Sequence, residues 1–126
     1  GHPLAADEWL PAPAQAAIGI ECRADDRRAR EWLAAIDHPP SRAEVMAERA
    51  LLAALGGSCH SPVAVLCNLA GAELAMRAAI YTPDGGEQVA GEARFAVEDA
   101  EGPARLAAEL LCRASARLAE QFSGSQ

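Results

Sequence analysis

Residues 63–97, VAVLCNLAGAELAMRAAIYTPDGGEQVAGEARFAV, decide the fold of this chain. They contain three apolar runs of period two, which is the side-chain period of a β-strand. Turn sequences, AGA at 70–72 and PDGG at 83–86, separate the runs and predict three antiparallel strands in a meander. The alternating positions are Val63, Val65, Cys67 and Leu69, then Leu74, Met76, Ala78 and Ile80, then Val89, Gly91, Ala93, Phe95 and Val97.

A helical pattern lies on each side of this stretch. Ser41, with Glu44 three residues later, predicts a capping box at the start of a helix that ends at Gly56-Gly57. Asp99 is expected to cap a last helix. The apolar faces are Val45, Leu52 and Leu55 with Ala47 and Leu51 beside them, and then Ala107, Leu111, Ala114, Leu118 and Phe122. The pattern predicts an α+β fold, a three-stranded antiparallel sheet with helices packed on one face.

Residues 1–38 contain elements that this sheet does not explain. The run AAIGIECR at 16–23 is consistent with a short buried strand, and the following acidic pair Asp25-Asp26 opens a predicted amphipathic helix. Pro39-Pro40 ends that helix. No further strand pattern is available to pair with residues 16–23, so this strand-helix segment has no sheet of its own in the sequence.

Composition excludes several classes of protein. A chain of 126 residues with 51% hydrophobic content is expected to form one soluble domain, and it contains no apolar run of membrane-spanning length. The net charge of −7 and the lack of lysine argue against nucleic-acid binding. Four cysteines without paired spacing favour reduced thiols over a zinc site or a disulfide scaffold, which predicts a cytoplasmic location and no metal.

Cys59 is the residue most suited to chemistry, because glycines before it and Pro62 after it predict an accessible loop. His60 beside it allows a cysteine-nucleophile interpretation, which is weak because adjacent side chains usually diverge. Cys67 shares a face with apolar residues and is expected in the core. Glu48 and Arg49 are expected to join an ion-pair network on their helix.

Two segments resemble the porphobilinogen deaminase (hydroxymethylbilane synthase) family. LPAPAQAAIGIECR at 10–23 is similar to the family's LPA-x-GQGA-x-x-IE-x-R pattern, with Ala14 and Ala16 in place of glycines. AERALLAALGGSCHSPVA at 47–64 matches the family's cysteine motif in register, with Ser61 at a position that is usually β-branched. The turn at Pro83 and the closing helix also fit, so the resemblance covers nearly the whole chain.

The resemblance implies a function and a division of the chain. Enzymes of this family condense four porphobilinogen molecules into hydroxymethylbilane on a dipyrromethane cofactor, and the cysteine at the position of Cys59 holds that cofactor through a thioether. Gln15 is a second, weaker cofactor-binding candidate. Residues 39–126 match the C-terminal domain, and residues 1–38 match a strand and helix that complete the first domain. The general acid/base and the carboxylate-binding arginines belong to earlier domains, so no catalytic residue is assigned in this chain.

Two function classes are compatible with these residues. One is the cofactor-carrying C-terminal part of the enzyme, whose partners are porphobilinogen and the N-terminal domains. The other is a stand-alone binding or interaction domain that keeps the fold without the reaction. On its own, the chain is expected to be inactive and to lack the cofactor. Its unpaired strand at 16–22 is expected to dock on a second copy or to be poorly ordered.

Overall fold

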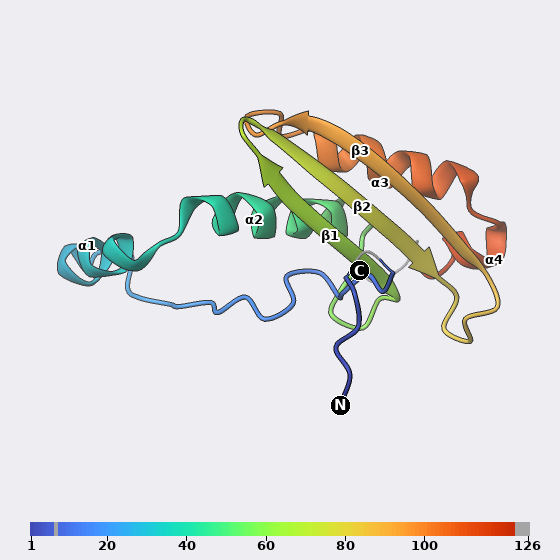
Figure 1. The fold of residues 1–126 in the computed structure, drawn as a ribbon, viewed down its shortest axis with the longest axis horizontal. Helices are drawn as coiled ribbons and strands as arrows, with labels where there is room; N and C mark the ends of the chain where they lie inside the picture. Colours follow the sequence, from blue (N-terminus) through green and yellow to red (C-terminus); the bar gives the residue numbers. More distant parts are fainter. Residues whose placement is uncertain (7, 123–126) are drawn as a thin grey trace.

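A computed structural model describes residues 1–6 and 8–122 of the chain. Its elements follow one another as helices and strands in the order drawn in Figure 1. They are α1 (Arg27–Ile36), α2 (Pro39–Ala54), β1 (Val63–Ala70), β2 (Glu73–Tyr81), β3 (Gln88–Ala96), α3 (Gly102–Arg113) and α4 (Ala116–Ala119). Helix, three strands and helix from residue 39 onward is the order that the sequence predicts.

The sheet is the predicted antiparallel meander, with strand order β1-β2-β3. Val63 pairs with Ile80 and Ile80 pairs in turn with Val89, so the three apolar runs lie in the same register on one face. Gly71, with a φ of 65°, occupies the short turn between β1 and β2. A positive φ of this kind is accessible to glycine at little cost, which explains the residue type at this turn.

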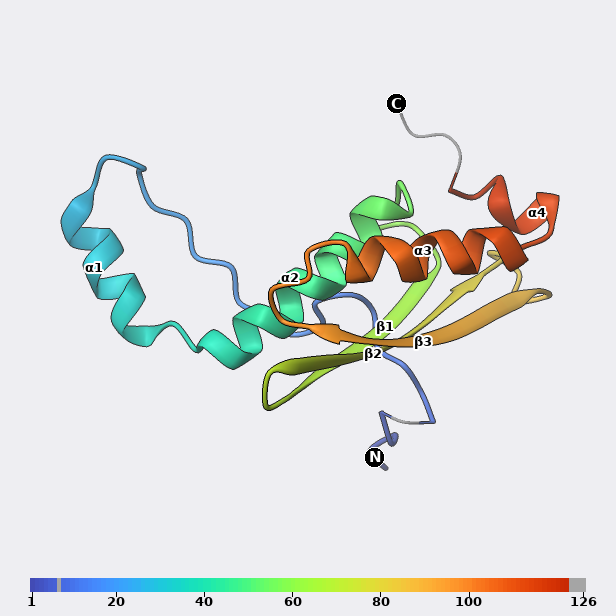
Figure 2. The same ribbon diagram turned by 90° about the horizontal axis from the view of Figure 1, so that it is seen from above.

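Both long helices cover the same face of the sheet, as predicted (Figures 1 and 2). α2 packs on β1, α3 packs on β3, and the two helices contact each other. The core between these layers consists of apolar side chains from all five elements together with Leu118 and Phe122 near the C-terminus. Its fully buried members include Leu51, Leu55, Val65, Met76, Ile80, Leu106 and Leu110.

The two long helices begin at other residues than the sequence suggests. α2 starts at Pro39 with His38 as its N-cap, and the His38 imidazole accepts the N–H of Ser41 at 3.3 Å. The predicted Ser41–Glu44 capping box does not form, because Glu44 accepts a backbone N–H from β1 instead. Likewise α3 starts at Gly102 rather than directly after Asp99, whose carboxylate accepts the N–H of Glu101 and pairs with Arg105.

The predicted last helix is two helices. α3 ends at Arg113, Ala114 is extended at the C-cap, and α4 starts after Ser115, whose hydroxyl accepts the N–H of Leu118. Within α3 the buried stripe is Leu106, Ala107 and Leu110, while Leu111, which the sequence places on the stripe, is half-buried. Leu118 and Phe122 still reach the core, as expected, because the chain turns back after α3.

Residues 1–38 lie mostly outside the α+β layers. α1 extends away from the sheet in both views and contains no buried residue (Figures 1 and 2). Residues 17–23 are exposed and extended without strand pairing, with Ile18 89% exposed. The buried strand that the sequence suggests at 16–23 is therefore not formed in this chain, whereas the helix after Asp26 is. Among the described residues, no helix combines the length and apolarity needed to cross a bilayer.

Candidate functional site

Two glycines shape the loop between α2 and β1. Gly56 has a φ of 67°, and a Cβ there would lie 3.0 Å from the carbonyl oxygen of Phe122. A Cβ at Gly57 would lie 2.5 Å from Leu52 Cδ1 and 3.2 Å from the Leu52 carbonyl oxygen, so a side chain there would require Leu52 to move. The left-handed backbone and the close carbonyl favour glycine at position 56, where the chain leaves α2 in a tight turn before the cysteine loop.

Hydrogen bonds across the loop hold Cys59 at its outer end. The N–H of Ser58 donates to Ser61 Oγ at 2.8 Å, and the N–H of Ser61 donates to the Ser58 carbonyl at 3.0 Å. The carbonyl of Pro62 accepts the N–H of Tyr81 at 3.0 Å, which joins the end of the loop to β2. Cys59 is exposed at this turn, as the sequence predicts.

A shallow cavity of about 430 Å³ opens beside Cys59. One wall is the loop itself, and the second is formed by residues 12–14, which come from far earlier in the sequence. The lining residues are Ala12, Pro13, Ala14, Arg49, Leu52, Ser58, Cys59, Ser61 and Val63. The thiol therefore lies at the edge of a hollow that offers apolar surface, two hydroxyls and one guanidinium.

Arg49 is the cation of this cavity. It is exposed, and it lines both the Cys59 cavity and a larger groove of about 580 Å³ that lies toward the N-terminal end of α2. None of the ion pairs found among residues 1–6 and 8–122 involves Arg49 or Glu48, so the ion-pair network predicted for them is wrong. An exposed guanidinium near a thiol is suited to holding a carboxylate of a ligand bound there.

The other cysteines differ from Cys59 in their surroundings. Cys67 is buried on β1, as predicted, and burial together with the nearby Glu48 and Glu44 raises the pKa of its thiol to about 12. Cys22 and Cys112 are exposed, the first on the extended segment and the second on α3. Neither of these two lines the Cys59 cavity. Cys59 is thus the cysteine that combines exposure with a lined hollow.

Two carboxylates from α2 cap the free edge of β1. Strand β1 is an edge strand, so alternate N–H groups along it have no partner within the sheet. The N–H of Val65 donates to the Pro11 carbonyl at 2.8 Å, that of Cys67 to Glu48 Oε1 at 2.9 Å, and that of Leu69 to Glu44 Oε1 at 2.8 Å. Glu48 also accepts the N–H of Ala14 through its Oε2, at 2.7 Å.

Burial acts on the Glu48 carboxylate more strongly than its hydrogen bonds do. The side chain is buried, and this desolvation raises the pKa of Glu48, with a further contribution from the charge of Glu44. The two backbone N–H groups act in the opposite sense, since they stabilise the ionised form. Sequence analysis missed this role of Glu48. The signal was available, because Glu44, Glu48, Leu51 and Leu55 follow at helical spacing on one face.

The segment that carries Ala14 has an unusual backbone. Ala14 has a φ of 55° and Ala16 a φ of 62°, both in the left-handed region that disfavours residues with a Cβ. Turn hydrogen bonds from Gln15 to the Ala12 carbonyl and from Ala17 to the Ala14 carbonyl, each at 3.1 Å, maintain this path. The two positions are those at which the resembling pattern has glycine, so alanine is present where the backbone favours glycine.

Gln15, the weaker binding candidate, does not meet Cys59. It lines a separate hollow of about 310 Å³ together with Glu44, Glu48 and Asn68, on the other side of the segment. Ala14 borders both hollows. The structure therefore brings the two predicted site residues near the same segment of chain and places them in different cavities.

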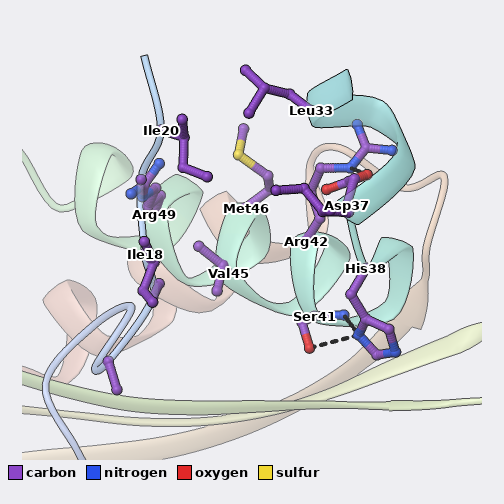
Figure 3. Close-up of a pocket in the computed structure, with 14 residues that line it drawn as sticks. Ile18, Ile20, Leu33, Asp37, His38, Ser41, Arg42, Val45, Met46 and Arg49 are labelled. Atoms are coloured by element: carbon purple, nitrogen blue, oxygen red, sulfur yellow. Dashed lines mark hydrogen bonds and ion pairs between the residues drawn. The ribbon is translucent and has the colours of Figure 1, made fainter. Parts of the chain in front are cut away.

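A larger groove separates the extended segment from α1 and α2. Figure 3 shows Ile18 and Ile20 on one side and Val45, Met46 and Leu33 on the other. Its floor near the helix junction is polar, with His38 Nδ1 at 2.9 Å from Ser41 Oγ and Arg42 paired with Asp37 at 2.9 Å. Ile18, Ile20, Ile36 and Met46, which line the groove, are more than half exposed. This groove therefore has an apolar lining that the described residues leave open.

The family model described as "Porphobilinogen deaminase, C-terminal domain" matches residues 42–112. The match covers more than half of the chain, from the first turn of α2 to the last turn of α3, and it includes the Cys59 loop. The chain belongs to the porphobilinogen deaminase family.

Family membership agrees with the fold and the loop together. The matched residues contain the whole sheet and both helices that cover it, so the family's C-terminal domain is the α+β layer described above. Residues 1–38, including α1 and the exposed segment, lie outside the match. The family name supports a porphobilinogen deaminase, an enzyme of porphyrin biosynthesis, as the parent protein.

Proposed function

We propose that this chain is the cofactor-carrying part of a porphobilinogen deaminase and that Cys59 is the attachment point for dipyrromethane. The observation that carries the proposal is the exposed Cys59 thiol beside a lined hollow, within the residues that match the family's C-terminal domain. When bound, the cofactor supplies a primer to which four porphobilinogen units are added, each with release of ammonia, to give hydroxymethylbilane.

The residues at the hollow fit such a group. A thiolate is a soft nucleophile, so Cys59 Sγ, once deprotonated, would hold the cofactor by bonding to the electrophilic methylene that remains when an aminomethylpyrrole loses ammonia. Thiol exchange does not cleave the resulting thioether, so the attachment persists through repeated additions. Arg49 supplies a positive charge for the carboxylates that substituted pyrroles carry, while Leu52 and Val63 offer apolar surface to the rings.

The reaction itself needs groups that we assign to other domains of the enzyme. A carboxyl group must exchange a proton with the reacting pyrrole, and several cations must hold the acetate and propionate side chains. Residues 1–126 carry a net charge of −7, which does not favour a polyanion-binding cleft. We therefore expect the isolated chain to lack both the cofactor and activity, with Cys59 as a free thiol.

We also propose that the groove in Figure 3 is the contact surface of residues 1–38 with the N-terminal domains. The exposed Ile18, Ile20 and Ile36, which line the groove, support this assignment, because apolar side chains at such density usually have a partner. In the isolated chain we expect a second copy to take that place. Gel filtration over a range of concentrations should show association, and Ile18→Asp should weaken it; a monomer at every concentration would contradict self-association.

Mass spectrometry of Cys59 tests the cofactor assignment. In the full-length enzyme, the peptide with Cys59 should carry the mass of a dipyrromethane, and Cys59→Ser should remove both this mass and the activity. Cys112→Ser is the matched control, since Cys112 is also exposed and should leave both unchanged. A free Cys59 thiol in the full-length protein would instead support a stand-alone binding domain that keeps the fold.

Incubation with porphobilinogen tests the expected inactivity. Residues 1–126 alone should form no bilane or uroporphyrin, whereas the full-length enzyme should form both. Turnover by the isolated chain above background would place the catalytic groups within these 126 residues and would contradict the assignment to other domains.

A further inference from the structure

The starting observation is that one buried carboxylate joins two segments far apart in the sequence. Glu48 Oε2 accepts the N–H of Ala14 at 2.7 Å, and Glu48 Oε1 accepts the N–H of Cys67 at 2.9 Å. Glu48 itself lies on α2. A single side chain on α2 thus connects residues 11–14 to the edge of β1.

The segment that Glu48 holds is also a wall of the Cys59 cavity. Ala12, Pro13 and Ala14 line that cavity opposite Ser58 and Cys59. The segment has one further backbone contact to the sheet, the bond from Val65 to the Pro11 carbonyl. Among residues 1–6 and 8–122, the bonds at Pro11 and Ala14 are those that attach residues 11–14 to the layers.

We propose that Glu48 is a positioning residue, which sets the width of the Cys59 cavity by fixing residues 11–14 against the edge of β1. The inference rests on the proposed function only in naming Cys59 as the reactive thiol. Two carboxylate oxygens serve two N–H donors, and this match requires a carboxylate. An amide at position 48 keeps one acceptor oxygen and turns an NH₂ group toward the second donor, so one of the two bonds is lost.

Glu44 provides a matched control for this role. It lies one turn earlier on the same helix and accepts the N–H of Leu69, and so it caps the same edge. No hydrogen bond joins Glu44 to residues 11–14 in the part of the chain that the structure describes. Glu44→Gln removes the charge but keeps an acceptor for the N–H of Leu69, so it controls for the loss of a carboxylate on α2 without releasing the wall.

Ala14→Pro removes the other partner of the same contact. Proline has no N–H and cannot adopt a φ of 55°, so the segment should leave its site while Glu48 keeps its bond to Cys67. Since Ala14 lies outside the core, this variant should fold even where Glu48→Gln does not. The two variants change different residues and should have the same effect on the cavity.

Hydrogen exchange and alkylation of the 126-residue chain test the proposal. In Glu48→Gln and Ala14→Pro, amides of residues 11–17 should exchange about tenfold faster or more, because the segment opens locally. Alkylation of Cys59 by iodoacetamide should accelerate several-fold relative to Cys112 in the same molecule, whereas Glu44→Gln should leave both readouts near those of the unmodified chain.

The outcomes separate this proposal from the function proposed above. Unchanged exchange at 11–17 and an unchanged Cys59 to Cys112 alkylation ratio in Ala14→Pro would overturn the role of the wall. An equal effect of Glu44→Gln would overturn the role of Glu48, because it would assign the effect to the loss of negative charge on α2. Neither readout requires dipyrromethane, so a failure of the cofactor assignment would leave them unaffected. If Cys59 carries an adduct, it cannot be alkylated, and hydrogen exchange at residues 11–17 alone then tests the role of Glu48.

Discussion

Gly102 at the start of α3 lies directly against the ring of Phe95 on β3. A Cβ built on Gly102 would be 2.3 Å from Phe95 Cγ and 2.5 Å from its Cδ2, distances at which atoms overlap. Both residues are buried, and Phe95 belongs to the core cluster. The absence of a side chain at position 102 therefore sets how closely α3 can approach the sheet.

Gly102→Ala should destabilise the fold through this contact. We expect a loss of about 1–3 kcal/mol in the free energy of unfolding, because the Phe95 ring or the helix must move, although alanine favours helix over glycine. Urea denaturation measures the loss. Gly19→Ala is the control, since no atom lies within 4 Å of a Cβ there. Phe95→Leu should cost less in the Gly102→Ala background than in the unmodified chain; equal costs would contradict the clash.

The period of the apolar residues was sufficient to predict the sheet. Three runs of period two gave the strands, their order and the buried face, because alternation directly reports which side of a strand faces the core. The starts of the helices were less predictable. His38 caps α2 and Glu44 bonds to β1, and a side chain that has a local and a distant partner available cannot be assigned from local sequence alone.

The candidate site likewise has one part that local sequence predicts and one part that depends on residues far apart in the chain. The Cys59 loop follows from adjacent residues, glycines before it and proline after it, so its exposure could be predicted. The second wall of the cavity could not, because Glu48 and Ala14 are 34 residues apart and meet only after the sheet has formed. The interpretation of Glu48 as part of an ion-pair network failed for this reason, since its partners are backbone N–H groups.

Glycine at positions 14 and 16 should stabilise the extended segment. Both alanines have a positive φ, which costs a residue with a Cβ about 1–2 kcal/mol. Glycine removes this cost, but it also raises the conformational entropy of the unfolded chain, which offsets part of the stabilisation. We expect Ala14→Gly and Ala16→Gly each to slow amide exchange in residues 11–17, by about 0.5–1 kcal/mol of opening free energy. Ala17→Gly, at a position without positive φ, should speed it; faster exchange in all three variants would contradict strain at positions 14 and 16.

The four thiols should differ in reactivity in the native chain. Cys59, Cys22 and Cys112 are exposed and should react with iodoacetamide at pH 8. Cys67 should stay unmodified, because it is buried and its pKa is raised to about 12 from an ordinary 9.0, which lowers its thiolate fraction roughly a thousandfold. Peptide mapping after timed alkylation gives the order, and urea should make Cys67 reactive. Modification of Cys67 before Cys59 in the folded chain would contradict the assignment of Cys59 as the attachment site.

Asp84 in the turn between β2 and β3 connects that turn to α4. Its carboxylate accepts the hydroxyl of Thr82 at 2.7 Å and the N–H of Gly86 at 3.1 Å, and it pairs with Arg117 at 2.5 Å. These contacts, that of Thr82 above all, hold the pKa of Asp84 well below its ordinary value of 3.8. The folded chain thus binds a proton at Asp84 less readily than the unfolded chain does.

This depression gives the Asp84 contribution to stability a definite pH dependence. The contribution is fully present above the unfolded-state pKa of 3.8 and is lost as the pH falls below it toward the lower folded-state value. Asp84→Asn should therefore lower the midpoint of thermal unfolding at pH 7, and the difference from the unmodified chain should shrink between pH 4 and pH 2.

Added salt should reduce the part of the Asp84 contribution that comes from Arg117, because both side chains are more than half exposed. Thermal unfolding followed by circular dichroism at several pH values measures this. A difference between the two chains that stays constant down to pH 2 would show that Asp84 acts through the shape of the turn and not through its charge.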